Sequence, residues 1–154
     1  MLSLFSKKPE YYFGVLLNSD NAVGFIFEIG KEQSNIVAKQ SCVLTNGWEQ
    51  LGDDMDSLLF RLETKTKKNP QSLIYFLHSS YIDNEKDEIK QPYKDSIKKL
   101  NKELDVKPLG YIECLDALAE IHNIKHGHSS QGILVEAEKT HITVAIIDNS
   151  KLVY

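Results

Sequence analysis

The sequence contains few of the residues that mark disulfide-rich, fibrous or membrane-spanning proteins. Its 154 residues include two cysteines, four prolines and eight glycines. Two cysteines cannot build a disulfide framework, and so little glycine and proline excludes a collagen-like or linker-dominated chain. The longest apolar runs, such as Ala145–Ile147, are far shorter than the roughly 20 residues that cross a bilayer. We therefore expect no transmembrane segment.

Basic residues are not in excess either. Lys and Arg number 18 and Asp and Glu number 22, so the net charge is -4. Proteins that bind nucleic acid through its phosphates need a positive surface, and we expect no nucleic-acid partner. The 42% of hydrophobic and 26% of charged residues are instead typical of a globular protein, and the length suits one domain.

The N-terminus reads Met-Leu-Ser-Leu-Phe-Ser-Lys-Lys. Its apolar residues precede its basic ones, whereas a secretory signal has the reverse order and a longer apolar part. We therefore expect a cytoplasmic protein with reduced thiols. Residues 1–10 are interpreted as a flexible N-terminal tail. The alternative is weak peripheral contact of residues 1–8 with the inner face of the membrane.

Strand-like and helix-like segments alternate along the rest of the chain. Short apolar, aromatic and β-branched runs predict strands at residues 11–17, 22–29, 35–44, 73–78, 109–112, 132–137, 141–148 and 151–154. Apolar residues spaced three and four apart predict helices over residues 48–67, 92–104 and 114–123. The third helix is expected to bury Leu115, Leu118 and Ala119, and the polar segments 83–91 and 125–131 are predicted loops.

This order of segments predicts an α/β fold. Short turns join the first three strands into an antiparallel meander, whereas strands joined through helices pair in parallel. We expect a mixed five-stranded sheet with helices on its faces, in the order strand-strand-strand-helix-strand-helix-strand-helix, over residues 11–131. Residues 132–154 are interpreted as the first β-meander of a second subdomain, or as edge strands that complete the domain.

Two groups of reactive side chains have plain interpretations. His122, His126 and His128 include one pair with metal-ligand spacing, but no cysteine or acidic ligand follows closely, and we interpret them as residues of a solvated loop. Cys42 and Cys114 lie in segments predicted to contribute to the core, next to Val43 and Leu115, and are interpreted as small buried side chains. We expect no metal site.

The order of elements resembles that of the actin-like ATPase superfamily, which includes sugar kinases, heat-shock chaperones, FtsA and PilM and has an RNase H-like sheet. The chain looks most similar to PilM-type pilus assembly proteins and FtsA-type cell-division proteins. Three stretches carry this likeness: the tail Met1–Lys8 with the first strand Phe13–Leu17, the segment Leu109–Leu118, and the meander Gly132–Val153. The resemblance implies the N-terminal half of an actin-like protein.

The resemblance also identifies two loops that would hold phosphates. The first loop of the superfamily reads roughly Asp-x-Gly-[Ser/Thr], and the matching residues here are Leu16, Leu17, Asn18 and Ser19. Leucine therefore replaces the aspartate and asparagine replaces the glycine, while the nearby Asp20 is expected to cap the turn.

The second loop of the superfamily reads about Asp-x-Gly-Gly. The matching residues are Glu136, Ala137, Glu138 and Lys139. Glu136 keeps a carboxylate, but both glycines are lost, and Glu138 would place a negative charge against a phosphate. The degenerate nucleotide-binding positions are therefore Asn18, Ser19, Asp20, Glu136, Glu138 and Lys139, and we expect neither catalysis nor a bound cofactor.

The function implied is a non-catalytic scaffold or interaction domain, similar to the cytoplasmic PilM-type component of a type IV pilus assembly machine. Its partner would be a protein, such as an inner-membrane pilus or envelope component, docked on an exposed sheet edge. Two alternatives stay open. One is a nucleotide-binding ATPase whose second half is absent from this chain, with Glu136 and magnesium holding ATP. The other is a self-associating structural domain, a homo-oligomer paired through residues 151–154 or 11–29.

Overall fold

A computed structural model describes residues 10–30, 34–127 and 131–153 of the chain. The tail predicted for residues 1–10, apart from Glu10, and the histidine at position 128 lie outside the described residues. None of the helices in the described residues combines the length and the hydrophobicity of a membrane span.

The elements follow the predicted order closely. The strands are β1 (Tyr11–Leu17), β2 (Asn21–Ile29), β3 (Ser34–Val43), β4 (Ser72–Leu77), β5 (Ile82–Asp83), β6 (Glu88–Ile89), β7 (Lys107–Glu113), β8 (Gly132–Ala137), β9 (Ile142–Asp148) and β10 (Lys151–Val153). The helices are α1 (Leu51–Thr66), α2 (Tyr93–Glu103) and α3 (Cys114–His126), with 3-10 turns η1 (Gly47–Gln50) and η2 (Ser79–Tyr81).

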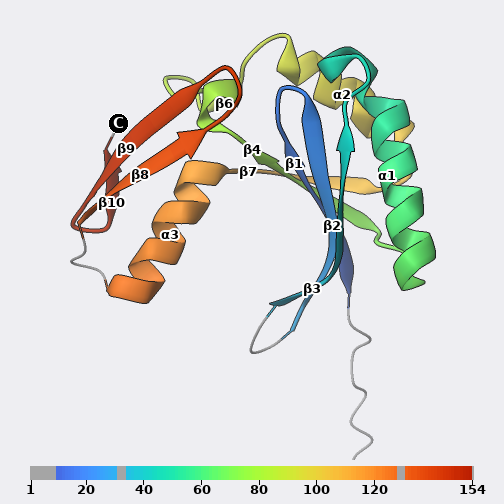
Figure 1. Cartoon of the computed structure of the whole chain (residues 1–154), viewed down its shortest axis with the longest axis horizontal. Coiled ribbons are helices and arrows are strands. Elements are labelled where there is room, and N and C mark those ends of the chain that lie inside the picture. Colours follow the sequence, from blue (N-terminus) through green and yellow to red (C-terminus); the bar gives the residue numbers. More distant parts are fainter. Residues whose placement is uncertain (1–9, 31–33, 128–130, 154) are drawn as a thin grey trace, which may run out of the picture.

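The five main strands form one mixed sheet in the order β3-β2-β1-β4-β7 (Figure 1). β1, β2 and β3 are antiparallel neighbours, whereas β4 is parallel to β1 and β7 is parallel to β4. The parallel pairs are those joined through a helix, as crossover connections require. The predicted α/β class, with its mixed five-stranded sheet flanked by helices, is confirmed.

The main core lies between this sheet and α1 and α2. Alternate residues of the central strands point into it and are fully buried: Phe13, Val15, Leu17, Leu73 and Leu77. The helix side contributes Leu51, Met55, Leu58, Leu59 and Leu62 of α1, and Ile97 and Leu100 of α2. The spacing of three and four along α1 places these residues on one face, so the helix buries the face that the sequence predicts.

The other face of the sheet carries a row of aromatic rings. Tyr12 stacks on Phe27 at 5.4 Å between ring centroids, and Phe25 contacts Phe27 at 5.7 Å and Phe76 at 5.4 Å. The ring of Phe25 lies across Gly14, where an added Cβ would stand 2.3 Å from its nearest atom. The glycine of β1 is therefore needed for close approach of the ring.

Strands β8, β9 and β10 form a separate antiparallel sheet in the order β10-β9-β8, and α3 contacts β7, β8 and β10. Figure 1 shows α3 and this sheet on the side away from α1. Ala145 and Ile147 are buried on one face. The other face exposes a row of branched side chains, each between 51% and 72% accessible: Ile133, Val135, Ile142, Val144, Ile146 and Val153. We call this row the outer face of the second sheet.

Three details differ from the sequence-based expectation. Leu118 is 40% exposed rather than buried, because the buried residues of α3 are Leu115, Ala119 and Asn123, four apart, and Leu118 lies beside that stripe. α3 also continues to His126, three residues beyond the predicted end. The charged segment 83–91 was expected to be a loop throughout, but β5 and β6 form a short hairpin that pairs Ile82 with Ile89.

Candidate functional site

Three loops meet where β1, β4 and β8 end. They are residues 18–20 after β1, the turn η2 after β4, and residues 138–141 after β8. Because β1 and β4 are parallel, their carboxyl ends share one edge of the sheet, which is where α/β proteins gather functional groups. The β8–β9 hairpin contacts that edge through its acidic side chains. The structure thus brings the two loops that the sequence matched to phosphate loops directly together.

Glu138 bridges the β8–β9 turn to the first loop. Its Oε1 accepts a hydrogen bond of 2.7 Å from the backbone N–H of Ser19 and another from the hydroxyl of Tyr81. Burial, and then the Glu138 carboxylate, raise the pKa of the Tyr81 hydroxyl, so Tyr81 stays protonated and acts as a donor at neutral pH. Beside this contact, Lys139 Nζ forms an exposed ion pair with Asp20 Oδ2 at 2.9 Å.

Glu136 makes a second bridge, and it is buried. Its Oε2 accepts a 2.9 Å hydrogen bond from the backbone N–H of Ser79, and its Oε1 lies 3.0 Å from Nδ1 of His78. The side chains of His78 and Glu136 are only 11% and 5% exposed. This pair therefore links the end of β4 to β8 within an environment that screens charge weakly.

Both ring nitrogens of His78 face oxygen atoms. Nε2 lies 2.6 Å from Oδ1 of Asn18, and the amide of Asn18 is oriented by the hydrogen bond from its Nδ2 to Oδ1 of Asn21 at 2.6 Å. An amide oxygen can only accept, so Nε2 carries a proton, while Nδ1 faces a carboxylate. The surroundings therefore favour the doubly protonated imidazolium.

The pKa values of His78 and Glu136 are shifted in opposite directions, and both shifts favour the charged form. Burial opposes protonation of His78, but the hydrogen bond and charge of Glu136 outweigh it and raise the pKa of the imidazole above its ordinary value. Burial likewise opposes ionisation of Glu136, but hydrogen bonds from His78 and Ser79 outweigh it and lower the pKa of the carboxyl. The two groups are therefore held as an ion pair.

A cluster of three aromatic rings, Trp48, Tyr81 and Tyr93, packs beside the loop of residues 18–20. Trp48 Nε1 donates a 3.0 Å hydrogen bond to the backbone oxygen of Asn18. The Trp48 ring packs against Tyr81 at 4.8 Å and against Tyr93 at 4.7 Å, and the two tyrosine rings contact each other at 4.6 Å. These contacts join η1, η2 and α2, so the position of the loop is fixed by three separate elements.

The two cysteines lie apart and are partly buried. Burial raises the pKa of the Cys114 thiol to about 12, and the nearby Glu136 adds to the shift. Burial also raises the pKa of Cys42. Neither thiol is activated as a nucleophile at neutral pH, because the thiolate is the reactive form.

The interpretation of the histidine motif as a loop is wrong for His122 and His126, because α3 continues through both, while the third histidine lies outside the described residues. The rings of His122 and His126 lie 4.6 Å apart between centroids. Across the described ranges 10–30, 34–127 and 131–153, no three histidine, cysteine, aspartate or glutamate side chains gather as a metal site would require.

Six positions were singled out from the sequence, and the structure places them at one point: Asn18, Ser19, Asp20, Glu136, Glu138 and Lys139. Their role toward a nucleotide stays a prediction. Sequence reasoning missed His78, Ser79, Tyr81 and Trp48 as their partners. The one usable signal was the position of His78 and Ser79 directly after a buried strand that pairs in parallel.

In sequence, the chain matches no protein-family model and no curated protein. In structure, it is similar to the ethanolamine utilization protein EutJ from Carboxydothermus hydrogenoformans, with a TM-score of 0.65 and 12% identity over 96% of this chain and 51% of EutJ. A Bacteroides thetaiotaomicron protein with an actin-like ATPase fold and unknown function gives a TM-score of 0.60 and 13% identity over 100% of this chain and 71% of that one. This chain has the actin-like ATPase fold.

Other proteins of the actin-like fold match over a similar span. The Ppx/GppA phosphatase of Aquifex aeolicus, type II variant, gives a TM-score of 0.57 and 7% identity over 94% of this chain and 50% of the phosphatase. The chain thus spans about half the length of the solved structures that match it first. At such low identities the likeness shows the actin-like fold and does not extend to activity.

Proposed function

We propose that this chain is a non-catalytic actin-like scaffold domain, similar to the cytoplasmic PilM-type component of a type IV pilus machine, in which carboxylates of the protein replace a nucleotide. The observation that carries this proposal is the pair of hydrogen bonds from backbone N–H groups to carboxylates: Ser19 to Glu138 at 2.7 Å, and Ser79 to Glu136 at 2.9 Å.

Backbone N–H groups in loops after strands are the usual donors to phosphate in α/β proteins. Here the two groups that face the meeting point of the loops donate to Glu136 and Glu138 instead. A hydrogen bond to an ionised carboxylate is about twice as strong as a neutral one. A phosphate would have to break these bonds before it could use the same donors.

Charge opposes a nucleotide as well. A phosphate oxygen about 4 Å from a carboxylate is disfavoured by about 4 kcal/mol near a protein surface. Two carboxylates, Glu136 and Glu138, stand at this point, and Asp20 is adjacent. The only cations that contact them are His78, already paired with Glu136, and Lys139, already paired with Asp20, as far as the described residues go. We therefore propose that neither ATP nor magnesium is a cofactor of this chain.

The scaffold hypothesis implies a type of partner and a cellular location. The partner is a protein, such as an inner-membrane pilus or envelope component, and the domain works in the cytoplasm at the inner face of the membrane. Residues 11–131 are proposed as the first subdomain and residues 132–154 as the start of a second. The ion pair of His78 with Glu136 and the contact of Ser19 with Glu138 would hold the two together without a ligand.

Calorimetric titration with ATP and magnesium tests the proposal. We expect no binding at about 1 mM ligand, and no ATP turnover by the unsubstituted chain. Micromolar binding that is lost in Glu136→Ala, but kept in the exposed control Glu120→Ala, would overturn the scaffold proposal. It would establish the alternative, a nucleotide-binding ATPase in which Glu136 holds the magnesium ion.

A second candidate is a self-associating structural domain, which the outer face of the second sheet favours. Six branched side chains that are each more than half exposed lie together on this face, and contiguous exposed apolar patches often mark interaction sites. Stacking this face on a second copy would bury it. Sedimentation should then show a dimer that Val144→Lys in the central strand β9 converts to monomer. A monomer at every concentration would remove this candidate.

A further inference from the structure

We propose that the free edge of β3 and the pocket beside it on α1 bind an extended acidic segment of a partner protein, which adds to the five-stranded sheet as a sixth strand. This inference rests on the proposed function as an interaction domain and names the surface and the chemistry of the partner. It depends on three observations: an open edge, a pocket along that edge, and an arginine with no acidic partner.

The two edges of the sheet differ in how well they can accept another strand. β7 contains Pro108, which has no N–H to donate, and its pairing with β4 shifts at the irregular step before Gly110. Proline protects an edge because it removes a backbone donor. β3 has ten residues and no proline, although its own pairing with β2 also shifts, between Ala38 and Ile36. Its only charged side chain is Lys39.

β3 is paired on one side alone. Within the described residues it forms a ladder with β2 and with no other strand. The outward N–H and C=O groups of its second half, Ala38 to Val43, therefore face no other described strand and can pair with an added one, which is how extended peptides bind the edges of sheets. The backbone would supply affinity, and side-chain pockets next to the strand would supply selectivity.

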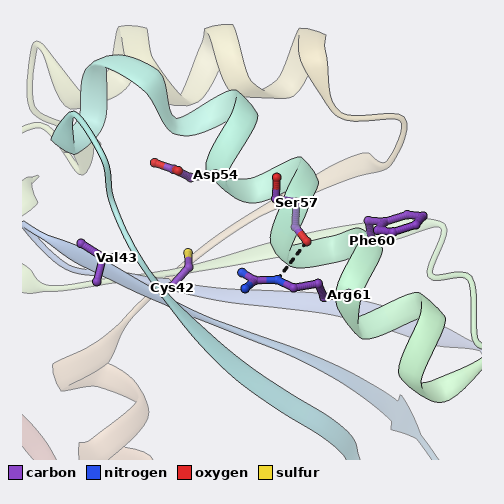
Figure 2. Close-up of a pocket in the computed structure, with 6 residues that line it drawn as sticks. All are labelled: Cys42, Val43, Asp54, Ser57, Phe60 and Arg61. Atoms are coloured by element: carbon purple, nitrogen blue, oxygen red, sulfur yellow. Dashed lines mark hydrogen bonds between the residues drawn. The ribbon is translucent and has the colours of Figure 1, made fainter.

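A pocket of that kind lies between the end of β3 and α1. It has a volume of about 530 Å³ and is lined by Cys42, Val43, Asp54, Ser57, Phe60 and Arg61 (Figure 2). Val43 is 75% exposed and Phe60 is 67% exposed, although both are large apolar side chains. An apolar side chain of an added strand would cover them and remove that surface from water.

Arg61 gives the pocket its charge preference. It is the only arginine in the sequence, and its Nε donates a 3.2 Å hydrogen bond to the backbone oxygen of Ser57. Figure 2 shows the guanidinium extended toward Cys42, across the pocket. In the described part of the chain Arg61 forms no ion pair.

Among the described residues, the acidic residue of the pocket, Asp54, forms no ion pair with Arg61. Both oxygens of Asp54 accept hydrogen bonds from Thr45, at 2.9 Å from the backbone N–H and 3.0 Å from the hydroxyl. A planar guanidinium fork matches a carboxylate better than any other common group. The pocket is thus suited to an extended segment that carries an aspartate or glutamate for Arg61 and, about two residues away, an apolar side chain for Val43 and Phe60.

A second copy of this chain does not fit the same surface. The residues of β3, from Ser34 to Val43, include no aspartate or glutamate. Pairing two copies of β3 would leave Arg61 without a carboxylate and would bring two Lys39 side chains to one interface. The occupant is therefore a different protein.

Selection of random decapeptides on the immobilised chain, followed by affinity measurement, tests the proposal. We expect the selected peptides to alternate branched apolar residues with at least one Asp or Glu. Arg61→Ala should weaken them about tenfold, whereas Lys65→Ala, one turn further along the exposed side of α1, should not. Arg61→Glu should abolish binding of the acidic peptide and restore binding when the peptide acid is replaced by lysine.

Amide chemical shifts locate the peptide-binding surface independently of the affinity measurements. Peptide addition should shift residues 34–43, with little effect on the site around Ser19. Peptides that bind without dependence on Arg61, shifts centred elsewhere, or no enriched peptide at all would each overturn the β3 proposal. ATP binding is measured separately, so docking at β3 in a chain that binds ATP would refute the scaffold function alone.

Discussion

His78 and Glu136 form a buried ion pair, with 3.0 Å between Nδ1 and Oε1, that ties the end of β4 to β8. The two residues are 58 positions apart in the chain. His78 directly follows β4 of the five-stranded sheet, and Glu136 lies in β8 of the second sheet. The pair also fixes neighbours at both ends, since His78 contacts Asn18 and Glu136 accepts the N–H of Ser79. It is therefore a buried polar link between the five-stranded sheet and the β8–β10 sheet.

Removing one member of this pair should be costly. His78→Ala leaves the Glu136 carboxylate buried without its cation, and breaking a buried pair in this way costs about 3–5 kcal/mol. We expect the free energy of unfolding in urea to fall by about that amount. His126→Ala, at the exposed end of α3, is the control and should change it by under about 0.5 kcal/mol. A small loss in His78→Ala would show that the pair does not couple the two sheets.

The same pair predicts how stability varies with pH. The pKa of His78 is raised from 6.5, so its contribution is full below about pH 6.5 and is lost as the pH rises through the higher folded value. The pKa of Glu136 is lowered from 4.5, so its contribution is full above about pH 4.5 and is lost as the pH falls through the lower folded value.

The difference in unfolding free energy between the unsubstituted chain and His78→Asn should therefore be largest between about pH 4.5 and 6.5 and shrink on both sides. Urea denaturation across that range measures it, and the effects of other titrating groups cancel in the difference. A difference that grows steadily from pH 6.5 to 9 would contradict the assigned ion pair.

Gly14 should not tolerate a side chain. A Cβ at this position would stand 2.3 Å from the ring of Phe25, so the ring or the strand must move, and overpacking of this kind costs about 1–3 kcal/mol. Gly14→Ala should lower the midpoint of thermal unfolding. The double substitution Gly14→Ala with Phe25→Leu should recover part of the loss relative to Phe25→Leu alone. Equal losses in both backgrounds would mean that the ring does not restrict this position.

Cys114 should react slowly in the folded chain. Its pKa of about 12 keeps the thiolate fraction small near pH 8, whereas an unfolded thiol has a pKa near 8.5. Alkylation by iodoacetamide should be at least about 100-fold slower in the native chain than in urea, as measured by mass spectrometry of the peptide that contains Cys114. Similar rates in both states would show that the thiol is exposed.

The periodicity of apolar residues was sufficient to predict the fold. The compact apolar run of β4 and the spacing of Leu51, Met55, Leu58 and Leu62 in α1 are local patterns that tertiary packing reinforced. Leu118 was predicted wrongly because α3 is apolar around much of its circumference. Ile121 and Ile124 of the same helix are also exposed, so sequence alone did not fix which stripe faces the sheet.

The site could be predicted only in part. The resemblance identified the two loops, and their side chains do contact each other. His78, Ser79 and Tyr81 come from a third segment, after β4, whose approach to Glu136 and Glu138 depends on the packing of two sheets. No local pattern records a contact between residues 57 or 58 positions apart. The hydrogen bonds from the backbone N–H groups of Ser19 and Ser79 to carboxylates were likewise visible only in three dimensions.

The central claim is that the N–H groups of Ser19 and Ser79 are used by Glu138 and Glu136 and not by a nucleotide. Titration of the isotopically labelled chain with ATP and magnesium, followed through the amide signals of Ser19 and Ser79, tests it most directly. We predict that neither signal moves up to about 1 mM ATP. Saturable shifts of both signals at micromolar ATP would contradict the account.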